Sequence, residues 1–226
     1  CSANKVPFIY ASSAATYGGG ENGYDDNEDL LSKLIPLNAY GYSKHFFDQW
    51  VYAQVNSSQP SPPQWCGLKF FNVYGPNEYH KNRMASVVFH AFKQYQKEKE
   101  IKLFKSENKN YKDGMQLRDF IYVKDAVEYV MFFLKNTHIS GLFNSGTGTA
   151  QSFKELAEAV ILNTKGNKND IKYIDMPVDL RGKYQYYTEA NLDKIKALGL
   201  NLKFKNLQEG VNDYMQNYLL TSDRYA

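Results

Sequence analysis

The amino-acid sequence predicts an α/β fold in which helices cover a largely parallel sheet. Short apolar runs, typical of buried strands, alternate along the chain with longer segments whose apolar residues recur at helical spacing. Gly, Pro and polar clusters separate these segments. Regular alternation of the two signals favours a layered fold built from successive strand–helix units.

The first part of the chain predicts two strands joined by a helix. Residues 8–11 are a short apolar run, and a Ser- and Gly-rich loop follows it. Residues 38–55 form the first expected helix, because apolar and aromatic side chains recur there at helical spacing. The run Gln-Pro-Ser-Pro-Pro at residues 59–63 breaks this helical pattern, and residues 66–71 form the second strand.

The pattern continues to the end of the chain. Residues 84–97 are expected to form a helix and residues 101–104 a strand, whereas residues 105–117 are polar and turn-rich, as in a surface loop. Further strands are expected at residues 120–123, 141–144 and 171–174, and further helices at residues 125–134, 191–198 and 207–219. The run Ser152-Phe-Lys-Glu155 fits a capping box, which opens one more helix.

Composition excludes several classes of protein. The 226 residues, 43% of them hydrophobic, can bury the core of one large or two small domains. The net charge of +3 is too small to indicate nucleic-acid binding. Cys1 and Cys66 cannot form a multi-bridge secreted scaffold, so a cytoplasmic location is expected. Apolar runs are only a few residues long, so we expect no membrane segment, and no signal peptide is recognisable.

The strongest local signal is the run Tyr40-Gly-Tyr-Ser-Lys44. Tyr40 and Lys44 are four residues apart on an expected helix, so their side chains share one face. A free tyrosine hydroxyl has a pKa of about 10 and is a poor base at neutral pH. A nearby ammonium favours the phenolate, and such a pair can move a proton to or from an alcohol. Taken alone the motif is weak, because the chain contains 19 tyrosines.

A hydroxyl-rich turn precedes this helix. Residues 10–18, Tyr-Ala-Ser-Ser-Ala-Ala-Thr-Tyr-Gly, continue a strand into a turn, and ligands of open α/β sheets bind at the carboxyl ends of strands. Ser12, Ser13 or Thr16 could there donate a hydrogen bond to a substrate oxygen. Alternatively, these hydroxyls satisfy backbone groups of the turn.

Four ordered motifs resemble the short-chain dehydrogenases of the extended, nucleotide-sugar branch. A Ser/Thr turn followed one helix later by Tyr-x-x-x-Lys is the catalytic pattern of that superfamily. Its downstream signatures resemble residues 70–76 (Phe-Phe-Asn-Val-Tyr-Gly-Pro), 118–125 (Arg-Asp-Phe-Ile-Tyr-Val-Lys-Asp) and 143–146 (Phe-Asn-Ser-Gly). The resemblance covers essentially the whole chain. It implies the C-terminal part of a Rossmann-type parallel sheet domain plus a smaller α/β substrate-binding domain.

Within this branch the chain most resembles the ADP-L-glycero-D-manno-heptose 6-epimerases. Dehydratases usually carry an acidic pair after the active-site Ser/Thr, whereas residues 14–17 contain no acid. UDP-galactose 4-epimerases usually have Asn-Pro where this chain has Asn72-Val73. Residues 72–86 resemble the heptose 6-epimerases, and so do the runs at residues 182–185 and 209–215.

This resemblance implies a reaction and a set of site residues. The family inverts C6 of an ADP-heptose by transient oxidation with NADP, through a 6-keto intermediate, in lipopolysaccharide core precursor synthesis. NAD is the alternative cofactor, and no metal site is expected. By match to the family, the catalytic residues are Tyr40, Lys81 and Thr16, the cofactor-binding residues are Lys44, Val73 and Lys81, and the substrate-binding residues are Asn72, Arg83, His90, Arg118 and Tyr184.

Three of these residues have simpler interpretations, and one other departs from the family pattern. Lys81 could be a solvated loop lysine, and Arg118 could form a surface pair with the following aspartate. His90 could be a core histidine of an expected helix. Arg83 stands where the family usually has a small hydroxyl residue, and residues 105–117 form a longer loop than usual.

The resemblance also implies a domain division and partners. Residues 1–71, about 120–146 and 186–209 would form the remainder of the NADP-binding domain. Residues from about 72–119, 147–185 and 210–226 would form the substrate-binding domain. The expected partner is a small-molecule nucleotide-diphosphate sugar, with neither nucleic acid nor membrane, and the full-length form is expected to be a homo-oligomer.

One part of a dinucleotide site is not in the sequence. No Gly-x-x-Gly-x-x-Gly turn, which binds the diphosphate of a dinucleotide, occurs in the 226 residues. The first residue is Cys, and a pattern typical of a buried strand begins already at Val6. We therefore expect a fragment without about three βα units, on the order of 100 residues. The fragment alone is expected to bind NADP poorly and to lack epimerase activity.

Two alternatives remain open from the sequence. The first is another nucleotide-sugar 4-epimerase, dehydratase or reductase of the same superfamily. The second is a non-catalytic binding module that keeps the fold, against which the ordered residues Tyr40, Lys44 and Lys81 argue.

Overall fold

A parallel three-stranded sheet forms one part of the molecule and confirms the predicted α/β class. The computed structural model describes residues 1–181 and 184–225. Strands β1 (Phe8–Ser13), β2 (Trp65–Phe70) and β6 (Gly141–Ser145) pair in the order β1-β2-β6, all parallel. Their register brings the ends of all three strands to one edge, because Ser13 is opposite Phe70 and Phe70 is opposite Ser145.

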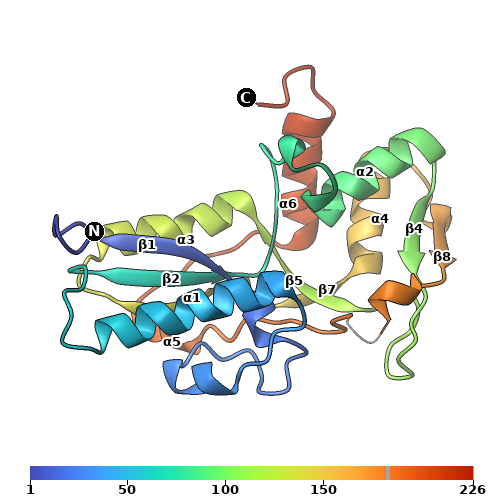
Figure 1. The fold of residues 1–226 in the computed structure, drawn as a ribbon. Coiled ribbons are helices and arrows are strands. Elements are labelled where there is room, and N and C mark those ends of the chain that lie inside the picture. Colours follow the sequence, from blue (N-terminus) through green and yellow to red (C-terminus); the bar gives the residue numbers. More distant parts are fainter. Residues whose placement is uncertain (182–183, 226) are drawn as a thin grey trace.

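Helices lie on both sides of this sheet. In Figure 1, α1 (Ala39–Val55) and α3 (Val123–Lys135) flank the β1–β2 pair. The short α5 (Asp193–Ala197) packs near β6. A buried apolar cluster joins sheet and helices through side chains such as Leu68, Tyr129 and Phe143, and burial of this surface is the main stabilising contribution.

A second group of elements carries its own apolar cluster. Strand β3 (Asn72–Tyr74) pairs parallel to β5 (Leu117–Tyr122), which pairs antiparallel to β7 (Ala150–Ser152). Strand β4 (Ile101–Phe104) pairs parallel to β8 (Ile171–Ile174). The helices of this part are α2 (Val87–Glu98), α4 (Phe153–Asn163), α6 (Leu207–Tyr214) and a π-helical continuation, η6 (Met215–Leu219). Their buried faces meet around Phe92, Leu156 and Tyr214.

Most of the expected strands and helices are present, with shifted ends. The strand at residues 171–174 and the capping box of Ser152 and Glu155 are confirmed. The helix expected from residue 84 begins instead at Val87, because Ser86 caps it after the 3-10 segment η3 (Tyr79–Met84). The predicted sheet is largely parallel but is divided into three separate sheets.

Four further 3-10 segments complete the described fold. They are η1 (Ala14–Tyr17), η2 (Glu28–Lys33), η4 (Lys168–Asp170) and η5 (Val178–Leu180). The spacing of apolar residues does not predict such segments, because a short turn contains no repeat. No helix in residues 1–181 or 184–225 has both the length and the apolar character needed to cross a membrane.

Candidate active site

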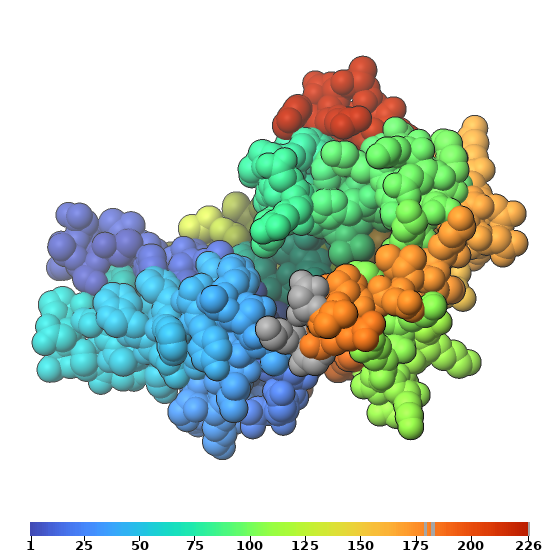
Figure 2. All heavy atoms as spheres, turned by 45° about the vertical axis from the view of Figure 1, so that its right-hand side comes forward, coloured from blue at the N-terminus to red at the C-terminus, as the bar shows by residue number. Residues whose placement is uncertain are grey.

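A cavity of about 560 Å³ opens at the carboxyl ends of β1, β2 and β3. Its walls come from the end of β1, the first turns of α1, the segment between β3 and α2, and one face of α3. Figure 2 shows a recess between the blue and cyan surface, which includes α1, and the green surface of α2. This is the edge at which open α/β sheets bind ligands.

The first turn of α1 presents Tyr40 and Lys44 to this cavity. Asn38 caps the helix, its side chain accepting a hydrogen bond from the Gly41 amide at 2.9 Å, so the helix begins one residue before Tyr40. Tyr40 is 54% exposed, and Lys44 Nζ donates to the Ala11 carbonyl at 2.9 Å. Both residues line the cavity, as their spacing on one helix face predicts.

Ser13 is the hydroxyl at the end of β1 that shares this cavity. It is the N-cap of η1, with its Oγ accepting a hydrogen bond from the Ala15 amide at 3.1 Å. Its hydroxyl hydrogen has no acceptor among the hydrogen bonds of the described residues, so it can be donated to a ligand. Ser12 also borders the cavity, but its hydroxyl donates to buried Asp48 at 2.7 Å.

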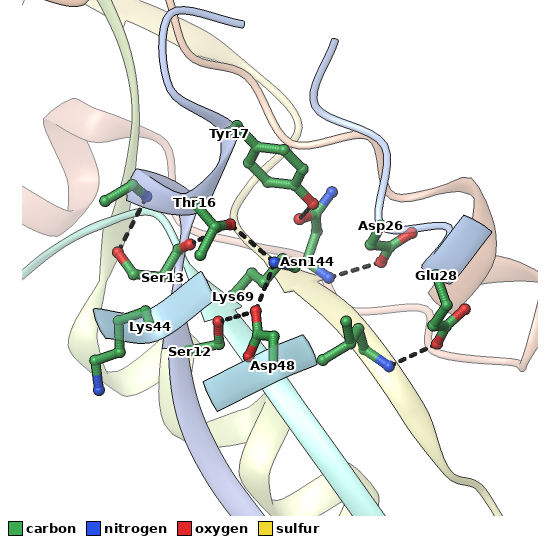
Figure 3. A network of polar contacts seen from close by, with 12 residues as sticks. Ser12, Ser13, Thr16, Tyr17, Asp26, Glu28, Lys44, Asp48, Lys69 and Asn144 are labelled. Atoms are coloured by element: carbon green, nitrogen blue, oxygen red, sulfur yellow. Dashed lines mark hydrogen bonds and ion pairs between the residues drawn. The ribbon is translucent and has the colours of Figure 1, made fainter. Parts of the chain in front are cut away.

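A buried ion pair lies beneath these residues. Lys69 of β2 and Asp48 of α1 are 1% and 0% exposed, and Lys69 Nζ is 2.7 Å from Asp48 Oδ2. Asp48 also accepts from Tyr10 and Ser12. Figure 3 shows Lys69 between Asp48 and Thr16, with Ser13 nearby. Burial lowers the pKa of Lys69, an effect that the Asp48 carboxylate opposes.

Thr16 does not lie where its predicted catalytic role requires it. Its side chain is 0% exposed, and its hydroxyl accepts a hydrogen bond from Lys69 Nζ at 2.8 Å and donates to the Ser13 carbonyl at 2.9 Å. Thr16 does not line the cavity, so the structure does not bring it together with Tyr40. Ser13 lines the cavity instead, because η1 turns the chain between the two residues.

The opposite wall carries three predicted residues. Asn72 and Val73 follow β2, and Lys81 lies on η3 with an exposed side chain. All three line the same cavity as Tyr40 and Lys44. The structure thus gathers five of the predicted site residues from two separate segments of the chain.

Four predicted substrate residues lie outside this cavity. Arg118 is 7% exposed, donates to the Leu117 carbonyl at 2.8 Å and to the Gln185 carbonyl, and lies 5.3 Å from the ring centre of Tyr184. The predicted surface pair of Arg118 with Asp119 is not formed, because Asp119 accepts from Thr147, Gly148 and Ala190. Gly182 and Lys183, part of the family-like run at residues 182–185, lie outside the described residues.

Arg83 and His90 contact each other and do not line this cavity. His90 Nε2 lies 3.2 Å from the Arg83 carbonyl, and both side chains are exposed. His90 lines a neighbouring cavity of about 440 Å³ along α2. Its exposure excludes the alternative interpretation of a core histidine.

Comparison with known proteins shows the family to which the chain belongs. The model of the NAD dependent epimerase/dehydratase family matches residues 1–146. A curated relative from Fusobacterium nucleatum, named ADP-L-glycero-D-manno-heptose-6-epimerase, is 52% identical over all of this chain and 69% of its own length. A relative of the same name from Nitratidesulfovibrio vulgaris is 45% identical over 68% of its length. The chain belongs to the ADP-L-glycero-D-manno-heptose-6-epimerases of the NAD dependent epimerase/dehydratase family.

Solved structures support the same relationship. The ADP-L-glycero-D-manno-heptose-6-epimerase of Helicobacter pylori matches with a TM-score of 0.76 and 29% identity, over 96% of this chain and 60% of that one. A Thermus thermophilus UDP-glucose 4-epimerase, solved with NAD, matches with a TM-score of 0.72 at 23% identity and supports the fold alone. This epimerase chain therefore spans about two thirds of the length of its curated relatives.

The residues of the cavity fit part of a nicotinamide cofactor. The volume of about 560 Å³ and the mixture of Tyr40, Lys44 and apolar Val73 suit a nicotinamide and its ribose. The glycine-rich turn that binds the diphosphate of a dinucleotide does not occur in these 226 residues. Within residues 1–181 and 184–225, no group of three His, Cys, Asp or Glu side chains is arranged to hold a metal ion.

Sequence reasoning assigned no role to three buried groups of this epimerase site. Asp48, Lys69 and Glu78 are each at most 5% exposed, and Glu78 borders the cavity directly. Charged residues inside an apolar strand or helix face are the available signal, because such residues are buried only when paired or well hydrogen-bonded. Lys69 within the run Cys66–Phe71 carried that signal.

Proposed function

We propose that this chain carries the catalytic centre of an epimerase that inverts C6 of an ADP-heptose. The observation that supports it most directly is the single cavity lined by Tyr40 and Lys44 on one side and by Lys81 on the other. Two acid/base groups suit an epimerisation, because the alcohol oxygen must occupy two positions when C6 changes configuration. The names of the relatives at 45–52% identity agree with this reaction.

In the proposed mechanism, Tyr40 and Lys81 each serve one configuration of the sugar. When bound, a nicotinamide would supply the redox chemistry, which is the removal of a hydride from C6 and its return. Tyr40 Oη removes the proton of the C6 hydroxyl in one configuration, and Lys44 holds the cofactor ribose. The 6-keto sugar then turns its other face, and Lys81 Nζ protonates the new C6 oxygen. Ser13 orients the oxygen while its charge develops.

The remaining residues bind the two ligands. Asn72 lines the same cavity as Lys81 and is proposed to contact the sugar. Arg118 and Tyr184 are proposed to bind the diphosphate end, since a guanidinium fork suits phosphate oxygens. Arg83 and His90 would lie along the outer part of the same substrate. The Val73 backbone and Lys81 are proposed as further cofactor contacts.

Further proposals concern the wider context. We propose NADP as the cofactor, a role in lipopolysaccharide core precursor synthesis, a cytoplasmic location and a homo-oligomer in the full-length form. We also propose the domain division given above. Two separate apolar clusters support it, one around Leu68 and Phe143 and the other around Phe92 and Leu156.

The test uses a full-length form that also contains the nucleotide-binding segment. ADP-D-glycero-D-manno-heptose is incubated with wild type, Tyr40→Phe and Lys81→Met, and the configuration of C6 in the product is measured. Each variant is expected to lose about 10²-fold or more in kcat, because each lacks one proton-transfer group. Tyr42→Phe, which changes an exposed tyrosine of the same helix, is the control and should keep wild-type turnover.

Two results would contradict the proposal. One is unchanged turnover of Tyr40→Phe. The other is preferential conversion of UDP- or dTDP-glucose by the wild type, which would identify a different nucleotide-sugar enzyme of this superfamily.

A further inference from the structure

Glu78 is a buried carboxylate at the wall of the catalytic cavity. Its side chain is 5% exposed, and none of the ion pairs among the described residues includes it. Burying an ionised carboxylate is costly unless hydrogen bonds replace its hydration. Four donors provide them here: Ser86 N at 2.5 Å, Ser86 Oγ at 2.6 Å, Tyr214 Oη at 3.0 Å and Gly75 N at 3.5 Å.

The contacts of Glu78 join the two ends of the segment that carries Lys81, residues 78–86. The Glu78 carbonyl accepts the Lys81 amide at 3.0 Å, and the Glu78 carboxylate binds Ser86 at the other end of the segment. Between them Asn82 has a φ of +49°, a conformation that a non-glycine residue rarely adopts without support from its surroundings. The Glu78 carboxylate therefore links the two ends of residues 78–86, a loop that contains the strained residue Asn82.

Two outside elements are joined to the same carboxylate. Ser86 is the N-cap of α2, where its Oγ accepts a hydrogen bond from the Phe89 amide at 3.2 Å. Tyr214 lies in α6, 136 residues further along the chain, and is itself 0% exposed. The segment that carries Lys81 is thus hydrogen-bonded, through Glu78, to two helices of the same apolar cluster. These bonds restrict its movement above the cavity.

We propose that Glu78 is a positioning residue that holds Lys81 against the cavity opposite Tyr40. It does not touch the reacting atoms and acts through the geometry of residues 79–86. This inference rests on the proposed function of Lys81 as the second proton-transfer group. A displacement of about 1 Å of a reacting group can lower a rate about 10²-fold, so a lost constraint on Lys81 should appear in kcat.

The test is a double-variant cycle in the full-length form. Glu78→Gln, Lys81→Met and their combination are compared by kcat, KM and the pH dependence of kcat. We expect Glu78→Gln to lower kcat about 10- to 100-fold with KM changed less than about 3-fold. We expect the double variant to be no slower than Lys81→Met alone, because a positioning residue has no effect once the group it positions is removed.

Further variants separate positioning from simple destabilisation. Tyr214→Phe removes one donor from the same carboxylate and should show a smaller loss of kcat with the same non-additivity, so it carries the test where Glu78→Gln does not fold. Tyr122→Phe removes a buried tyrosine hydroxyl bonded to Asp213 at 2.7 Å and should leave kcat unchanged. Glu78→Asp, which keeps the charge, should recover part of the activity lost in Glu78→Gln.

The outcomes distinguish this inference from the proposed function. If Lys81→Met is slow but the losses of Glu78→Gln and Lys81→Met multiply, Glu78 has only a structural role and the inference fails while the function of Lys81 stands. If Lys81→Met keeps full activity, the proposed role of Lys81 fails and the inference fails with it.

Discussion

At the scale of single residues, the buried cation Lys69 determines what its neighbours do. Its ammonium binds Asp48 and Thr16 and lies 5.1 Å from the ring centre of Tyr17. Because removal of one partner leaves a buried charge incompletely satisfied, each of these groups contributes to stability through Lys69. Thr16 therefore lies beneath the cavity and contacts Lys69, whereas Ser13 lines the cavity.

This arrangement predicts different effects at two neighbouring hydroxyls. Thr16→Val should lower the free energy of unfolding by about 1–3 kcal/mol, since Lys69 loses one acceptor, and should change kcat only a few-fold. Ser13→Ala should lower kcat about 10-fold or more and lower the free energy of unfolding by about 1 kcal/mol, because the Ala15 amide loses the side chain that caps it. Urea unfolding and steady-state kinetics of the full-length form measure both effects. A Thr16→Val variant that is stable but inactive would restore the direct catalytic role predicted from the sequence.

Titration of Asp26 should make the stability of the protein depend on pH. Burial raises the pKa of its carboxyl from 3.8 to about 6, although a hydrogen bond from the Asn144 amide opposes the effect. The folded state therefore binds the proton more tightly than the unfolded state. The stability that this group contributes is present below about pH 4 and is lost as pH rises through about 6.

Asp26→Asn removes this titration and keeps an oxygen that can accept from Asn144. The variant should be more stable than the wild type at pH 7, by on the order of 3 kcal/mol at most, and similar to it at pH 4. Urea unfolding of both proteins at the two pH values measures the difference. Lower stability of Asp26→Asn at pH 7 would mean that the ionised carboxylate is the favoured form.

At the scale of elements, the start of α1 fixes the position of Tyr40. Asn38 caps the helix, and Gly41 allows its first turn to approach η1 closely. A Cβ at Gly41 would lie 2.7 Å from the Ala15 carbonyl oxygen and 2.9 Å from Pro36 Cβ. These contacts are too short for any side chain, so the glycine sets the distance between Tyr40 and the end of β1.

Gly41→Ala tests that distance. Alanine favours helix by about 1 kcal/mol relative to glycine, but the contact with Ala15 should outweigh this gain and displace the first turn. We expect lower stability and a kcat reduced about 10-fold or more in the full-length form. Gln49→Ala, further along the same helix, is the control for general effects on α1. A more stable and fully active Gly41→Ala would show that η1 can move away without affecting the site.

At the scale of the whole molecule, the site is assembled from both apolar clusters. Tyr40, Lys44 and Ser13 belong to elements around the β1-β2-β6 sheet, whereas Lys81 and Glu78 are held by α2 and α6. The cavity lies where the two groups of elements meet, as Figure 2 shows. The shape of the cavity therefore depends on the position of one cluster relative to the other.

The isolated 226-residue chain gives a prediction at this scale. It contains the proposed proton-transfer groups but no glycine-rich turn for the diphosphate of a dinucleotide. We expect the isolated chain to bind NADP weakly, with a Kd in the millimolar range, and to show no turnover of ADP-heptose. Calorimetric titration with NADP and product analysis measure the two properties. Micromolar binding or detectable turnover would contradict the expectation.

The sequence alone determined the features that depend on neighbouring residues. The spacing of Tyr40 and Lys44 places both on one helix face, and Ser152 with Glu155 forms the predicted capping box. Strand positions and the α/β class follow from local apolar patterns, and ordered motifs were sufficient to recognise the family. These properties are local because they are set by helical periodicity and by side chains at most four residues apart.

Only the tertiary structure decided which polar groups face the cavity and which lie beneath it. Ser13 and Thr16 are three residues apart and look alike in sequence, but after the turn of η1 only Ser13 of the two lines the cavity. The partners of Glu78 and Lys69 lie up to 136 residues away. Such contacts depend on how strands and helices pack together, and no periodic pattern in one chain segment encodes them.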